Sequence, residues 1–128
     1  MKVMIIGSGG MEHAIAKKLS QSGKITQIFV CPGNGGTAHE FFNVNIELTP
    51  PFEKLIQFIK NEKIELTVIG PEVYLVDGIT DYLTKSGIRV FGPTKSGAML
   101  EGSKHFAKKI MFKANVPTAE FNYFNNYE

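Results

Sequence analysis

The stretch VMIIGSGGMEHA, residues 3–14, decides the fold. Its first four residues are apolar without polar alternation, which predicts a strand that is buried on both faces. The glycine-rich run Gly7-Ser8-Gly9-Gly10 then predicts a tight turn. Met11, Ile15 and Leu19 follow at four-residue spacing, which is typical of the apolar stripe of a helix. A strand that leads through glycines into a helix is the opening unit of a parallel α/β sheet.

The same alternation continues along the chain. Further short apolar runs at 28–30, 44–46, 66–69 and 90–91 predict four more strands. Helical spacing is found within 52–59 and 75–83. Strands separated by helices, with right-handed crossovers, predict an α/β fold with a doubly wound, Rossmann-like five-stranded parallel sheet.

Several residues predict where the helices begin and end. Thr49 is expected to cap the second helix, with Pro50 and Pro51 in its first turn. Gly87 is expected to stop the third helix in the left-handed conformation. Thr94 and Ser103 are expected to cap two short helices that follow the last strand.

Composition narrows the class of protein. The chain has 128 residues, 43% of them hydrophobic and 20% charged, with a formal net charge of +2. These values favour one folded domain over disorder, and the small net charge predicts no nucleic-acid partner. The opening apolar run stops at Gly7, too short for a membrane span, and the lone Cys31 suits a reducing cytoplasm. The histidines at 13, 39 and 105 show no zinc-ligand spacing, so no metal site is predicted.

The turn Gly7 to Gly10 is a candidate anion site, because glycines let a phosphate approach the backbone at a helix N-terminus. A dinucleotide site would need a third glycine where Glu12 stands, and an acidic residue after the second strand, where Pro32 and Asn34 stand instead. NAD is therefore disfavoured. A phosphate or phosphosugar ligand, and a turn built only for tight packing, both remain open.

Other candidate residues follow later strands, at the edge where open α/β sheets bind ligands. Asn34 and Thr37 follow the second strand and offer donors to phosphate or sugar oxygens. Glu72 follows the fourth; it either complements a helix dipole or accepts from a ribose diol. Lys104 is expected in the first turn of its helix, where a cation opposes the dipole and hints at an external anion. Cys31 is expected to be a small buried hydrophobe, and no nucleophilic triad can be assembled.

These residues also carry a resemblance to a known family. The matching motifs are IGSGGMEHA at 6–14, PGNGGTA at 32–38, LTVIGPE at 66–72, FGPTK at 91–95, LEGSK at 100–104, Phe106-Ala107-Lys108 and Pro117-Thr118-Ala119. In order and spacing they resemble the amino-terminal domain of the phosphoribosylamine–glycine ligase family, of the ATP-grasp superfamily. The resemblance covers nearly the whole chain and implies the fold that precedes an ATP-grasp domain.

The resemblance implies a ligase of purine biosynthesis that joins glycine to 5-phosphoribosylamine, splitting ATP with Mg²⁺. ATP would phosphorylate the glycine carboxylate, and the amine would then attack the acyl phosphate. Carried over to this sequence, it implies a phosphosugar site made by Gly7, Ser8, Gly9, Gly10, Glu12, His13, Asn34, Gly35 and Glu72, and a nucleotide-phosphate contact at Lys104. No catalytic residue and no metal ligand is implied within this chain.

Two residues depart from the family pattern. Met11 stands where the family usually has arginine, and Tyr74 where it usually has proline. The loss of the arginine removes a cation that would bind phosphate or carboxylate.

The division expected from the sequence is a phosphosugar-binding domain over 1–117, followed by 118–128 as the first strand of a missing ATP-grasp domain. The chain by itself is then expected to be inactive in ligation. Two alternatives stay open: a stand-alone phosphosugar- or nucleotide-binding module, and an assembly domain whose aromatic tail pairs with a separate ATP-grasp chain.

Overall fold

The computed structural model, which describes residues 1–124, places the first apolar run at the centre of a sheet. This strand, β1 (Lys2–Gly7), pairs in parallel with β2 (Gln27–Pro32) on one side and with β4 (Leu66–Ile69) on the other. The short strands β3 (Phe42–Asn43) and β5 (Val90–Phe91) form the edges, so that the order is β3-β2-β1-β4-β5. The predicted doubly wound, five-stranded parallel sheet is confirmed.

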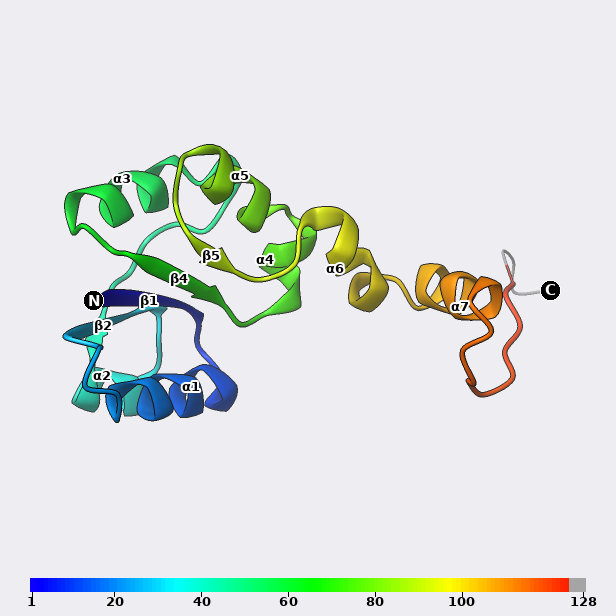
Figure 1. Ribbon diagram of the computed structural model, residues 1–128, viewed down its shortest axis with the longest axis horizontal. Helices are drawn as coiled ribbons and strands as arrows, with labels where there is room; N and C mark the ends of the chain where they lie inside the picture. Colours follow the sequence, from blue (N-terminus) through cyan, green and yellow to red (C-terminus); the bar gives the residue numbers. More distant parts are fainter. Residues whose placement is uncertain (125–128) are drawn as a thin grey trace.

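Helices cover both faces of this sheet (Figure 1). On one face lie α1 (Gly10–Ser20) and α2 (Gly35–Glu40); on the other lie α3 (Glu53–Asn61), α4 (Glu72–Val76) and α5 (Ile79–Lys85). The pleat of β1 divides its side chains between two cores: Val3 and Ile5 join one apolar cluster, and Met4 and Ile6 join the other. All four are fully buried, which explains the absence of polar alternation in the opening stretch.

Two further helices, α6 (Lys95–Gly102) and α7 (Lys104–Lys113), follow the last strand. The hydroxyl of Thr94 accepts from the backbone N–H of Gly97, and the hydroxyl of Ser103 accepts from that of Phe106, so both predicted caps are confirmed. Gly87 has a φ of 78°, as predicted for the residue that stops the third helix. Figure 1 shows α6 against the body of the fold and α7 standing apart from the sheet.

The predicted third strand is wrong in position. Pairing with β2 occurs at Phe42–Asn43, and after the backbone N–H of Val44 donates to the carbonyl of Val30 the chain leaves the ladder. Val44, Ile46 and Leu48 nevertheless pack against the larger core. Their alternation therefore reflects contact with the core rather than strand pairing.

The predicted start of the second helix is also wrong. Pro50 and Pro51 lie before α3, and the residue that precedes the helix is Phe52, in the left-handed conformation with a φ of 62°. Its ring is only 1% exposed and packs edge-on against Tyr82. Burial of this ring, rather than a cap by Thr49, determines where α3 begins.

The third predicted helix, over 75–83, is divided in two. Gly78 has a φ of 90°, and its N–H closes α4 by donating to the carbonyl of Leu75. A left-handed glycine ends a helix, so α5 begins anew at Ile79.

Candidate functional site

The order of the strands reverses at β1, because the chain adds β2 and β3 on one side of β1 and then returns to add β4 and β5 on the other. The loops after β1 and β4 consequently lead to helices on opposite faces, α1 and α4 (Figure 1). In open α/β sheets the crevice between two such loops is where ligands bind. The candidate residues Gly7 to Gly10 and Glu72 belong to these two loops or to the helix starts that follow them.

The turn after β1 presents its backbone to solvent. Gly7 needs the absence of a side chain because its φ is 137°. Ser8, Gly9 and Gly10 are exposed, and a Cβ atom added at Gly10 would meet no atom within 4 Å. The N-terminus of α1 is thus open to a ligand at Ser8–Gly10, where the exposed backbone meets the positive end of the helix dipole.

Glu12 is buried behind this turn, with only 3% of its surface exposed. Its Oε2 accepts the backbone N–H of Gly9 at 2.7 Å. Its side chain also fills the space beside Gly7 and Gly70, where a Cβ atom would lie 2.4 Å from Cγ and 2.0 Å from Oε1, respectively. Sequence reasoning placed Glu12 among ligand contacts and missed this burial, because Gly70 lies far away in the sequence.

The position of this carboxylate also bears on dinucleotides. In the dinucleotide fingerprint the third glycine permits close packing of helix on strand. Here the buried Glu12 takes that place, so the chain lacks the third glycine of the dinucleotide fingerprint.

The turn after β2 is tied to the turn after β1. The side-chain oxygen of Asn34 accepts the N–H of Thr37 at 3.0 Å, and its amide nitrogen donates to the carbonyl of Ser8 at 2.9 Å. Thr37 is fully buried; its hydroxyl accepts the N–H of Asn34 at 2.8 Å and donates to the carbonyl of Asn34 at 3.0 Å. Both expected donors to a ligand are thus engaged within the protein. Gly35 stays open, because a Cβ atom added there would have no neighbour within 4 Å.

The same hydrogen bonds define α2, a helix that the sequence analysis did not predict. Asn34 and Thr37, three positions apart in the sequence, cap each other reciprocally at the start of α2. The sequence pattern that could have predicted this helix is an Asn directly after a strand, followed three positions later by a Thr.

His13 lies where α1 meets α2. Its Nε2 is 3.1 Å from Oε1 of Glu40, and its ring packs edge-on against Phe41. Lys17 also pairs with Glu40, and the hydrogen bonds from Lys17 and then from His13 hold the pKa of this carboxyl below its ordinary value. His13 therefore joins two helices beside the turn, and 30% of its side chain remains exposed.

Glu72 and Lys104 lie on different helices. Glu72 is exposed at the first position of α4, in the loop that follows Gly70. Lys104 is exposed at the start of α7, the helix that stands apart from the sheet in Figure 1. It lines a hollow with His105, Lys108, Phe121 and Tyr123. The structure thus joins the turns after β1 and β2 through Asn34 and sets Gly70 against Glu12, while Lys104 lies on the separate helix α7.

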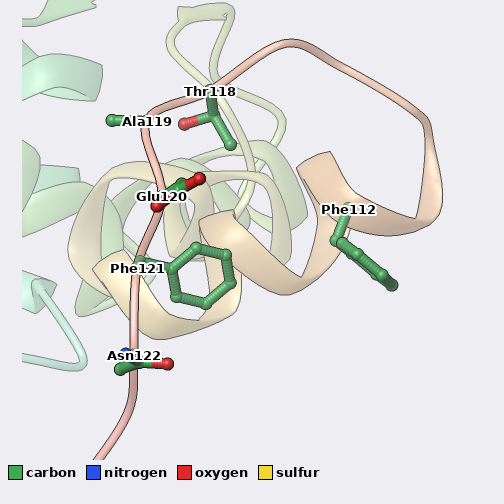
Figure 2. Close-up of a pocket in the computed structure, with 6 residues that line it drawn as sticks. All are labelled: Phe112, Thr118, Ala119, Glu120, Phe121 and Asn122. Carbon is green, nitrogen blue, oxygen red and sulfur yellow. The ribbon is translucent and has the colours of Figure 1, made fainter.

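A second hollow lies at the end of α7, lined by Phe112 and residues 118–122 (Figure 2). Lys108 shapes it by donating to the hydroxyl of Thr118 and to the carbonyl of Ala119. Residues 118–124 form no strand, and the remainder of the strand expected there, 125–128, lies outside the described residues.

Neither a membrane-spanning helix nor a metal cluster is found in residues 1–124. No helix in this part of the chain has the length and apolar character needed to cross a membrane. No three His, Cys, Asp or Glu side chains gather there in a way that would hold a metal ion.

Comparison with known proteins agrees with the fold and with the motifs. The sequence pattern of the phosphoribosylglycinamide synthetase N domain matches residues 1–101. The chain belongs to this family. It is 52% identical over 130 aligned residues to the phosphoribosylamine–glycine ligase of Clostridium acetobutylicum and 47% identical to that of Escherichia coli K12. Each alignment covers 100% of the chain and 30% of the relative.

Solved structures agree with this family membership. The phosphoribosylamine–glycine ligase of Thermotoga maritima is 35% identical and superposes with a TM-score of 0.70, covering 95% of this chain and 27% of that one. The biotin carboxylase subunit of pyruvate carboxylase superposes with a TM-score of 0.63 at 16% identity, which shows a shared fold alone. The chain spans about 30% of the length of the curated ligases that it matches.

Proposed function

We propose that the chain is the N-terminal, phosphosugar-binding part of a cytoplasmic, ATP-dependent ligase that joins glycine to 5-phosphoribosylamine in purine biosynthesis. The observation that carries the proposal is the family match over residues 1–101, supported by relatives about half identical along the whole chain. The grouping of the glycine-rich turns at one sheet edge is consistent with it.

Within this proposal, the phosphosugar contacts the exposed residues of the edge. Ser8 and Gly10 offer backbone N–H groups to the phosphate, while Gly9, whose N–H is held by Glu12, and Gly35 leave room for the ligand to approach the two turns. Glu72, exposed at the first position of α4, accepts from ribose hydroxyls. A carboxylate that receives two hydroxyl hydrogen bonds is well suited to a vicinal diol.

The remaining site residues act through shape. Gly7 permits the turn, Asn34 ties the first turn to the second, and Glu12 and His13 anchor the start of α1 from behind. These residues hold the binding backbone in one arrangement, which lowers the entropic cost of ordering the site when a ligand binds.

ATP and Mg²⁺ are proposed for the whole ligase, where ATP supplies the activation of the glycine carboxylate. Lys104 is the proposed contact to nucleotide phosphates; Lys108 lines the same hollow and adds a second cation. We propose the division 1–117 for the phosphosugar domain and 118–128 for the start of an ATP-grasp domain. Since the chain spans about 30% of the length of the ligases that it matches, the chain alone is expected to show no ligation.

Calorimetry on the full chain tests the proposal. Ribose 5-phosphate should bind, whereas NAD should not. Glu72→Gln should weaken ribose 5-phosphate about tenfold, since a hydrogen bond to a charged group contributes about 1.5 kcal/mol or more. Asp77→Asn, which changes another exposed acid at the far end of α4, is the matched control and should leave binding unchanged.

Two results would contradict the proposal. One is binding of AMP or NAD without any response to ribose 5-phosphate, which would favour a nucleotide-binding module. The other is ATP- and glycine-dependent product formation by the chain alone, which would contradict the proposed need for further catalytic residues.

A further inference from the structure

We infer that Glu12 is a positioning residue that locks the turn after β1 to the loop after β4, and thereby sets the spacing between the phosphate-binding backbone and Glu72. The inference rests on the proposed function, because it concerns the same phosphosugar site. It assigns to Glu12 no contact with the ligand.

The contacts of the side chain lie on both loops. On the β1 side, Oε2 accepts the N–H of Gly9 at 2.7 Å, and Cγ and Cδ lie against Gly7. On the β4 side, Gly70 lies so close that an added Cβ would be 2.0 Å from Oε1 and 2.6 Å from Cδ. One carboxylate thus fills the space between two loops that arise from adjacent strands.

Gly70 is itself held to the sheet, because its N–H donates to the carbonyl of Ile6 at 3.0 Å. The backbone conformation at Gly70 is not left-handed, so glycine is required there for space and not for its φ angle. The space it provides is the space that Glu12 occupies. The two residues are therefore a matched pair, although they lie far apart in the sequence.

Both contacts of Glu12 lie close in the sequence to residues that are proposed to bind the ligand. Gly9 is one of the exposed residues proposed to meet the phosphate, and Gly70 stands two residues before Glu72. When the carboxylate is removed, the Gly9 N–H loses its partner and the loop after β4 loses the surface on which it rests. Both ends of the phosphosugar site would then shift relative to each other.

Charge has a separate effect from shape. The carboxylate lies in the first turn of α1, where the positive end of the helix dipole stabilises it. Glutamine in its place keeps the length of the side chain and an oxygen that accepts from Gly9. A lock that works by shape and hydrogen bonding should therefore survive Glu12→Gln but not Glu12→Ala.

The experiment measures binding of ribose 5-phosphate to the full chain by calorimetry, with unfolding of every variant followed in urea. Glu12→Ala should weaken binding at least tenfold, and Glu12→Gln should stay within about threefold of the unaltered chain. Glu53→Ala is the matched control: it removes an exposed acid from the first turn of α3 and should leave binding unchanged.

A double-mutant cycle tests the contact between the loops. Gly70→Ala should weaken binding and lower stability in the unaltered chain, because its methyl group strikes the carboxylate. In the Glu12→Ala background the same methyl group enters vacated space, so Gly70→Ala should cost little there. If Glu12→Ala does not fold, Glu12→Ser takes its place in the cycle, because serine lacks the Cδ and Oε1 atoms that lie 2.6 Å and 2.0 Å from a Cβ atom added at Gly70.

Three outcomes would overturn the inference. Folded Glu12→Ala that binds as tightly as the unaltered chain would show that the carboxylate does not position the site. Equal effects of Gly70→Ala with and without Glu12 would show that the two loops are not coupled through it. A loss of binding in Glu12→Gln as large as in Glu12→Ala would assign the effect to charge. Failure of the unaltered chain to bind ribose 5-phosphate would instead contradict the proposed function, which the variants alone cannot do.

Discussion

Replacing Thr67 by valine should stabilise the fold. Thr67 lies on β4 and is fully buried, and within residues 1–124 its hydroxyl has no hydrogen-bond partner. A buried hydroxyl without a partner costs about 1–3 kcal/mol of desolvation, and valine replaces it with a methyl group of similar shape. Valine also favours strands. The free energy of unfolding should therefore rise by about 1–2 kcal/mol, which corresponds to an increase in Tm of about 5 °C or more.

Thr37 offers the matched control for this substitution. It is equally buried, but its hydroxyl accepts from the N–H of Asn34 and donates to the carbonyl of the same residue. Thr37→Val should lower the free energy of unfolding by about 1–3 kcal/mol, because it leaves the N–H without a partner. Urea unfolding followed by circular dichroism measures both variants. If Thr67→Val were as destabilising as Thr37→Val, the reasoning from hydrogen-bond satisfaction would be refuted.

Three further predictions concern single residues. Burial raises the pKa of the Cys31 thiol, so the folded chain should react with a thiol reagent at neutral pH far more slowly than the urea-unfolded chain; equal rates would contradict the burial. Glu40, whose pKa is lowered by hydrogen bonds from Lys17 and His13, should titrate below an ordinary glutamate in NMR, and Lys17→Met should raise its pKa. A lowered pKa means that this contribution to stability is present above the ordinary pKa and is lost as the pH falls through the folded value, so a loss on raising the pH would be the wrong sign. Lys63, exposed after α3 with a φ of 56°, should tolerate glycine with a gain of about 0.5–1 kcal/mol in unfolding free energy, and a loss would argue against the left-handed conformation.

The sequence predicted the parts of the fold that depend on local chemistry. Runs of apolar residues identified β1, β2, β4 and β5, and the capping roles of Thr94 and Ser103 followed from hydroxyl groups placed directly before helices. These features need only neighbouring residues, so their signal is complete in a short window. The division between α4 and α5 was missed because the helical spacing of apolar residues over 75–83 continues across Gly78 without a break.

The candidate site was predicted as a set of residues but not as an arrangement. The turns after β1, β2 and β4 come together because parallel strands end at one edge, which topology alone implies. The burial of Glu12 against Gly70 and the use of Asn34 to tie two turns depend on contacts between distant segments. No spacing rule in a single sequence reports such contacts.

The most direct test of the central claim is an amide NMR titration of the full chain with ribose 5-phosphate. The resonances of Ser8, Gly9, Gly10, Gly35 and Glu72 should shift together with one dissociation constant, while that of Lys104 should stay in place. Shifts confined to Lys104 and its neighbours on α7, or no shifts at the three turns, would contradict a phosphosugar site at this edge of the sheet.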